Sequence, residues 1–132
     1  MKNKKGFTLI EILCVIVLIG ILSVIATISI VNLSSKSKEN LYCAKIELIE
    51  NIAASYGIKY ELELNNSNEL YNGYKSLKIK VRTLVDAGKL EPDKKNDVIN
   101  PKDNTIMNDI DIILYLKNNQ IKAEIPNNIC EK

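Results

Sequence analysis

The sequence predicts an α+β fold in which one long N-terminal helix packs on a small antiparallel β-sheet. The first supporting feature is an apolar run from Phe7 to Val31 that continues, without proline, into an amphipathic stretch. The second is a pair of short downstream segments in which apolar and polar residues alternate between turn-forming residues. With 132 residues, the chain can hold one small domain besides that helix.

The apolar run contains 25 residues, of which Glu11 is the only strongly polar one. As a helix, it would span about 37 Å, which is enough to cross a bilayer. An ionised carboxylate in hydrocarbon costs about 2.5 kcal/mol or more, so Glu11 needs a partner. The run is too long for a signal peptide and lacks a cleavage site of the A-x-A type. A plain membrane anchor would leave Glu11 unexplained.

The helix is expected to continue to about Leu62. Its second half carries an apolar stripe at four- and three-residue steps, made of Tyr42, Ile46, Ile49, Ala53 and Tyr56. Three further apolar residues are expected to widen this face: Leu41, Leu48 and Ile52.

The rest of the chain is expected to form a small α/β head. Its predicted elements are a loop at 65–73, a strand at 74–81, a short helix at 82–92 closed by Gly88, a turn-rich segment at 93–104 and a hairpin at 105–126. Asn118 and Asn119 are expected to form the turn of the hairpin. In the strand before this turn, one face is expected to carry Ile110, Ile112, Leu114 and Leu116, and the opposite, mainly polar face Asp109, Asp111, Ile113, Tyr115 and Lys117.

The segment KKGFTLIE, from Lys4 to Glu11, resembles the processing and assembly segment of type IV prepilins and pseudopilins. The resemblance implies that a prepilin peptidase cuts between Gly6 and Phe7 and that Phe7 is then N-methylated. It also implies that Glu11 meets the new α-amino group of a neighbouring subunit's Phe7, which would set the register of the stacked helices. The resemblance covers the first 31 residues strongly and the remainder only as pilin-like architecture.

This interpretation divides the chain into a cleaved leader (1–6), a transmembrane and assembly half of the helix (7–31), an amphipathic half (32–62) and a head (63–132). The peptidase of this family works on the cytoplasmic side. The resemblance therefore implies a single-pass protein of the cytoplasmic membrane, with its C-terminal domain outside, that moves into an extracellular pilus or pseudopilus. Its expected partners are other pilin subunits, the prepilin peptidase and the inner-membrane assembly platform.

Composition argues against several other classes of function. There is no histidine, no nucleophile–base arrangement and no glycine-rich phosphate loop, so we expect neither an enzyme nor a cofactor. Lys2, Lys4 and Lys5 supply three of the 18 basic residues, and the other 15 face 16 acidic ones. Such a balance gives no reason to expect a nucleic-acid partner.

Three carboxylates in the turn-rich segment, Asp93, Asp97 and Asp103, could offer oxygen ligands to calcium. Their spacing does not match an EF-hand, and the lysines between them oppose a cation. We therefore expect a solvated loop and no metal.

Cys43 falls on the outer half of the helix, and Cys130 just past the last expected strand. Because that strand should lie near the helix, the tail could return to it, and the two cysteines could form a disulfide outside the cell. The alternative is two unpaired thiols, one buried against the sheet and one on a frayed tail.

The leading hypothesis is a structural subunit of a type IV pilus, either minor or pilin-like, that polymerises through its N-terminal helix. An alternative within the family is a pseudopilin of a type II secretion or competence (DNA-uptake) machine. An alternative of another class is a membrane-anchored binding protein that does not polymerise.

Overall fold

The structure is a computed structural model that describes residues 6–130, with the side chains of residues 25–32 outside the description. Apart from Gly6, the predicted leader lies outside the described residues. The chain divides into two compact parts, Met1–Ser37 and Lys38–Lys132. Each part is described by itself.

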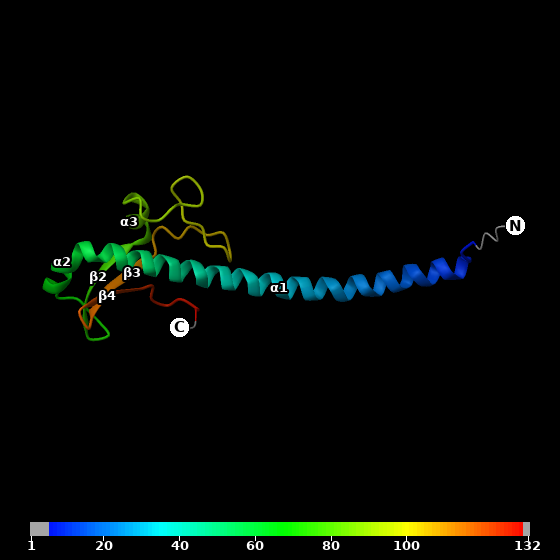
Figure 1. The fold of residues 1–132 in the computed structure, drawn as a ribbon, viewed down its shortest axis with the longest axis horizontal. Helices are drawn as coiled ribbons and strands as arrows, with labels where there is room; N and C mark the ends of the chain where they lie inside the picture. Colours follow the sequence, from blue (N-terminus) through cyan, green and yellow to red (C-terminus); the bar gives the residue numbers. More distant parts are fainter. Residues whose placement is uncertain (1–5, 131–132) are drawn as a thin grey trace. The chain divides into compact units, whose positions relative to one another are not determined.

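Helix α1 runs over 49 residues, from Leu9 to Gly57 (Figure 1). A single 3-10 turn, η1 (Ile58–Tyr60), and a short helix, α2 (Glu61–Asn66), follow it. The long N-terminal helix is thus confirmed, but its predicted continuation to Leu62 is wrong because the backbone tightens at Ile58. The apolar pattern did not reveal this break because it continues into α2, whose Leu64 is buried.

Four antiparallel strands form one sheet in the order β1-β2-β3-β4. They are β1 (Leu70–Tyr71), β2 (Tyr74–Lys80), β3 (Asp111–Lys117) and β4 (Gln120–Glu124). The register pairs Ile79 with Ile112 and Leu114 with Ala123. The predicted small antiparallel sheet is therefore confirmed. The strand predicted at 74–81 is also confirmed, except that it ends at Lys80 and Val81 begins the next helix.

Both tight hairpins turn on residues with positive φ. Asn118 and Asn119 have φ of 53° and 62° between β3 and β4, as type I′ turns require. Asn72 and Gly73, with φ of 51° and 83°, do the same between β1 and β2. The prediction of a plain loop at 65–73 is therefore wrong at its end, where an Asn-Gly turn folds β1 back onto β2.

The short helix α3 (Val81–Asp86) lies within the predicted helical segment but ends earlier. Gly88 has φ of 68°, its N–H donates to the Val85 carbonyl at 2.9 Å, and the Lys89 N–H donates to the Leu84 carbonyl at 2.9 Å. These bonds form a Schellman cap, in which glycine adopts the left-handed conformation without steric penalty.

The core of the second part lies between α1 and the sheet. α1 contributes Ile46, Ile49 and Ala53 from the predicted stripe, and β3 contributes Ile112 and Leu114. Further buried residues come from α2, β2, α3, the following loop and the position just after β4: Leu64, Ile79, Val81, Leu84, Leu90, Val98, Met107 and Ile125.

Two details of the predicted core are wrong. Leu41 and Leu48 do not widen the buried face, since they are 57 % and 52 % exposed. Ile113, which was expected on the polar face of its strand, is buried. It lies on the second strand from the sheet edge, where cross-strand neighbours Lys78 and Glu124 flank it.

Candidate functional site

The start of α1 is held by a reciprocal pair of hydrogen bonds between Thr8 and Glu11. The Glu11 N–H donates to Thr8 Oγ1 at 3.3 Å, and the Thr8 N–H donates to Glu11 Oε2 at 3.3 Å. This arrangement is a capping box, which satisfies two of the unpaired N–H groups at a helix start. A carboxylate in the first turn also interacts favourably with the helix dipole.

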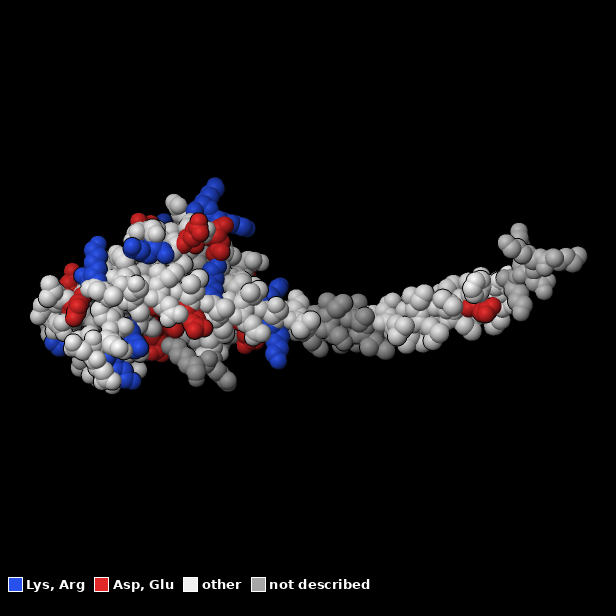
Figure 2. All heavy atoms as spheres, viewed as in Figure 1, with Lys and Arg blue, Asp and Glu red and all other residues white. Residues whose placement is uncertain are grey.

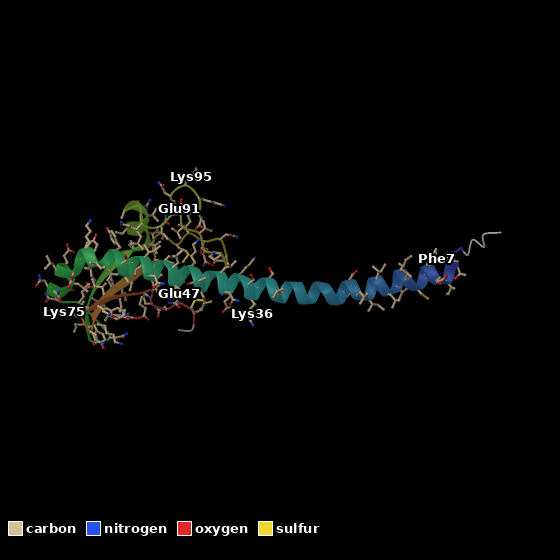
Figure 3. All side chains as sticks on the ribbon, in the orientation of Figure 1. Phe7, Lys36, Glu47, Lys75, Glu91 and Lys95 are labelled. Atoms are coloured by element: carbon tan, nitrogen blue, oxygen red, sulfur yellow. A yellow bond between two sulfur atoms is a disulfide. The ribbon has the colours of Figure 1, made fainter. Side chains whose placement is uncertain are left out.

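Gly6 and Phe7 precede the helix and are exposed. Phe7 is 79 % exposed, and Figure 3 shows it at the N-terminal end of α1. A Cβ added to Gly6 would meet nothing within 4 Å. The Gly6–Phe7 peptide bond therefore lies in non-helical, open backbone, and no contact within the described chain demands glycine at position 6.

The N-terminal half of α1 presents hydrocarbon on all its described faces. Its large apolar side chains between Phe7 and Val24 are all at least half exposed, and Glu11 is the only charged residue from Gly6 to Val24. Figure 2 shows acidic atoms at one place near the start of this otherwise uncharged segment. A helix that is apolar all round needs a partner to cover it.

Within the described residues, no helix was found with the length and hydropathy needed to span a membrane.

Cys14 is an exposed free thiol on this surface. It lines a shallow apolar depression of about 330 Å³ with Leu13, Val17 and Leu18. Ser23 turns its hydroxyl inward and donates to the Ile19 carbonyl at 2.7 Å, so it adds no free polar group to the helix surface.

In the second part of the chain, a disulfide joins Cys43 to Cys130, with Cα atoms 5.5 Å apart. The sequence had left this pairing open against two unpaired thiols. Figure 1 shows the C-terminal segment running back from β4 beside α1. A second tie accompanies the disulfide, because the Ile125 N–H donates to Glu50 Oε1 at 2.8 Å in a buried position.

The three carboxylates considered for calcium bind separate protein groups. Asp93 Oδ2 pairs with Lys45 Nζ and accepts the Ile99 N–H at 2.7 Å. Burial raises the pKa of Asp93, but the hydrogen bond from Ile99 and the Lys45 cation outweigh this effect and hold the pKa below its ordinary value.

Asp97 Oδ1 accepts a hydrogen bond from Asn108 Nδ2 at 2.8 Å. Asp103 accepts the Thr105 hydroxyl at 2.6 Å, and this bond lowers the pKa of Asp103. No group of three metal-ligating side chains occurs among the described residues.

Sequence reasoning missed three functional or structural side chains. Thr8 was detectable, because threonine three residues before glutamate at the start of an apolar run is the capping-box signature. Glu50 and Asn108 gave no such signal, because each looks like an ordinary surface polar residue. Each is nevertheless buried: Glu50 accepts the Ile125 N–H, 75 positions away, and Asn108 accepts the Val98 N–H, 10 positions away.

Residues 1–27 match the family model of the prokaryotic N-terminal methylation motif. The match includes Gly6, Phe7, Thr8 and Glu11, and it agrees with the signal of type IV pilins and pseudopilins described above. It supports a type IV pilin-like or pseudopilin protein. Searches of curated proteins and of solved structures gave no significant match.

Proposed function

We propose that this chain, which carries a prokaryotic N-terminal methylation motif, is the precursor of a minor or pilin-like subunit of a type IV pilus. The observation that carries the proposal is the coincidence of that motif with an exposed apolar N-terminal half of α1, in which Glu11, in the first turn, is the only charged residue up to Val24. The role is structural, and no step of catalysis is assigned to the chain.

Processing starts at the open Gly6–Phe7 bond. Hydrolysis there releases the leader and leaves an α-amino group on Phe7, which is cationic at neutral pH by its reference pKa of about 8. Because a side chain at position 6 would meet nothing in the described chain, the need for glycine belongs to the peptidase pocket. N-methylation of the Phe7 amine follows.

Glu11 has two successive partners in this proposal. In the uncut chain it caps the helix, and its bonds to Thr8 are long, at 3.3 Å and 3.5 Å, and therefore weak. After cleavage, the cationic amine of a neighbouring subunit can replace Thr8 as its partner. In a low-dielectric environment, such a pair loses much of its Coulomb energy to desolvation, so its main effect is to fix the stagger between helices.

The apolar half of α1 is the segment through which the subunit is held in the membrane and then assembled. It inserts once into the cytoplasmic membrane with the C-terminal head outside, and it then exchanges lipid for the helices of other subunits. The prepilin peptidase and the inner-membrane assembly platform act on it in turn. The covering that this segment lacks in the isolated chain is then supplied first by lipid and later by the filament core.

The first test is mass spectrometry of the mature protein. We expect Phe7 at the N-terminus, heavier by one methyl group, and recovery of the protein in filaments sheared from cells. Gly6→Val should block cleavage while the head keeps its near-ultraviolet circular dichroism. An intact leader on assembled protein would refute the processing step. Processed protein that stays in the membrane and never enters filaments would favour the non-polymerising anchor.

A second test separates the two roles of Glu11. Glu11→Gln keeps an oxygen that can accept the Thr8 N–H but removes the charge, whereas Thr8→Ala weakens the cap but keeps the charge. Both should be cleaved. If Glu11 acts by pairing with an amine, Glu11→Gln should lose filament incorporation and Thr8→Ala should retain most of it. If Glu11→Gln keeps filament incorporation and Thr8→Ala loses it, Glu11 acts only by capping the helix.

A further inference from the structure

A groove of mixed polar and apolar lining runs between α1 and strand β4 in the part Lys38–Lys132. It consists of two adjoining hollows of about 720 Å³ and 510 Å³, and Lys122 lines both of them. One wall is formed by α1, η1 and the start of α2, and the other by β4 with the C-terminal segment. The disulfide between Cys43 and Cys130 lies in the lining of the larger hollow.

The β4 wall is an open sheet edge, because β4 is the last strand in the order β1-β2-β3-β4. Lys117 and Gln120 are partners across the two-residue turn, so they exchange hydrogen bonds with each other. In an antiparallel pair the inward-facing backbone groups alternate along the strand. The N–H and C=O groups of Ile121 and Ala123 therefore point away from β3 at the free edge, and both residues line the groove, so these groups can pair with an added strand.

The opposite wall combines small side chains with acids. Its small residues are Ala44, Asn51, Ala54 and Ser55. Glu47 and Glu61 are exposed and form no ion pair with another described residue, and Figure 3 shows Glu47 on the side of α1 next to the C-terminal segment. Counting Glu50, three carboxylates line the groove against one cation, Lys122.

We propose that this groove binds an extended, basic peptide segment of another protein as a fifth strand on β4. Main-chain hydrogen bonds to Ile121 and Ala123 would supply affinity, and lysine or arginine side chains near Glu47 and Glu61 would supply selectivity. Glu47 lies on α1 and lines the larger hollow, whereas Glu61 is the first residue of α2 and lines the smaller one. Basic residues at the first and seventh positions of a strand lie about 20 Å apart on the same face, so a seven-residue segment can direct one basic side chain toward each hollow.

The probe is the synthetic peptide acetyl-Lys-Val-Thr-Val-Thr-Val-Lys-amide, whose sequence reads the same in either strand direction. Titrated into the ¹⁵N-labelled full chain in detergent micelles, it should shift the amide signals of Ile121 and Ala123. The matched peptide with glutamate at both ends should bind at least about fivefold more weakly, as expected for two partly exposed charge pairs. A peptide N-methylated at alternate backbone nitrogens should not bind, because it cannot complete the ladder.

Two protein variants complete the test. Glu47→Gln combined with Glu61→Gln should remove the preference for the basic peptide over the acidic one. Ala123→Pro removes the N–H that points away from β3, so it should abolish binding while the β3–β4 pairs remain. If Ala123→Pro unfolds the sheet, the N-methylated peptide still decides the question.

Equal binding of acidic, basic and N-methylated peptides, or shifts confined to residues outside the groove, would overturn the proposal. Shifts of Ile121 and Ala123 that depend on protein concentration alone would overturn it in favour of a second copy of this chain. None of these outcomes bears on cleavage at Gly6, so the proposal stands or falls separately from the function proposed above.

Discussion

Removal of the disulfide by Cys130→Ser is expected to lower the stability of the head strongly. Cys43 and Cys130 are 87 residues apart, so their bond closes a loop spanning most of the part Lys38–Lys132. In the chain-entropy model, such a loop restricts the unfolded chain by about 4.6 kcal/mol at 25 °C. At about 4–8 °C per kcal/mol for a domain of this size, the melting temperature should fall by about 20–35 °C.

Thermal unfolding of the full chain in detergent, followed by near-ultraviolet circular dichroism of tyrosine, measures this effect. All six tyrosines lie between Tyr42 and Tyr115, so the signal reports only the part Lys38–Lys132. Wild-type protein under reducing conditions should match Cys130→Ser, and Cys14→Ser should behave like the oxidised wild type, because that thiol is free. A loss below about 1 kcal/mol would show that the cross-link does not restrict the unfolded chain as the model requires.

Three further changes test the packing of the head. Gly57→Ala places a Cβ 2.9 Å from Ile121 Cγ2, so it should destabilise by about 1–3 kcal/mol in urea unfolding, and Ile121→Ala in the same chain should recover part of that loss. Asn108→Ala leaves the buried Val98 N–H without its acceptor and should cost about 1–3 kcal/mol, measured in the same way. The lowered pKa of Asp93 means that its stabilising contribution is present above the ordinary aspartate pKa of about 3.9 and is lost as pH falls through the lower folded value. Asp93→Asn should therefore lose less stability than the wild type between about pH 6 and pH 3.

The head shows where patterns in the sequence were enough and where they failed. The stripe of Ile46, Ile49 and Ala53 and the turn at Asn118 and Asn119 were predictable, because helical periodicity and turn chemistry depend on neighbours a few residues away. The exposure of Leu48 was not predictable from the sequence. The apolar stripe shows which face of α1 points toward the sheet, but it does not show how wide a strip of that face the sheet covers.

By itself, the sequence determined the N-terminal signal: the glycine, the aromatic residue after it, the acid four positions on and the long apolar run are all local in the chain. It also determined the Thr8–Glu11 capping box, because the two residues of this box lie within one helical turn of each other. Only the tertiary structure decided that Cys43 meets Cys130, that Glu50 holds Ile125 and that the edge of β4 borders a groove on α1. Each of these contacts joins residues about 60 or more positions apart, and their meeting depends on how the whole sheet lies on the helix, which no short-range pattern encodes.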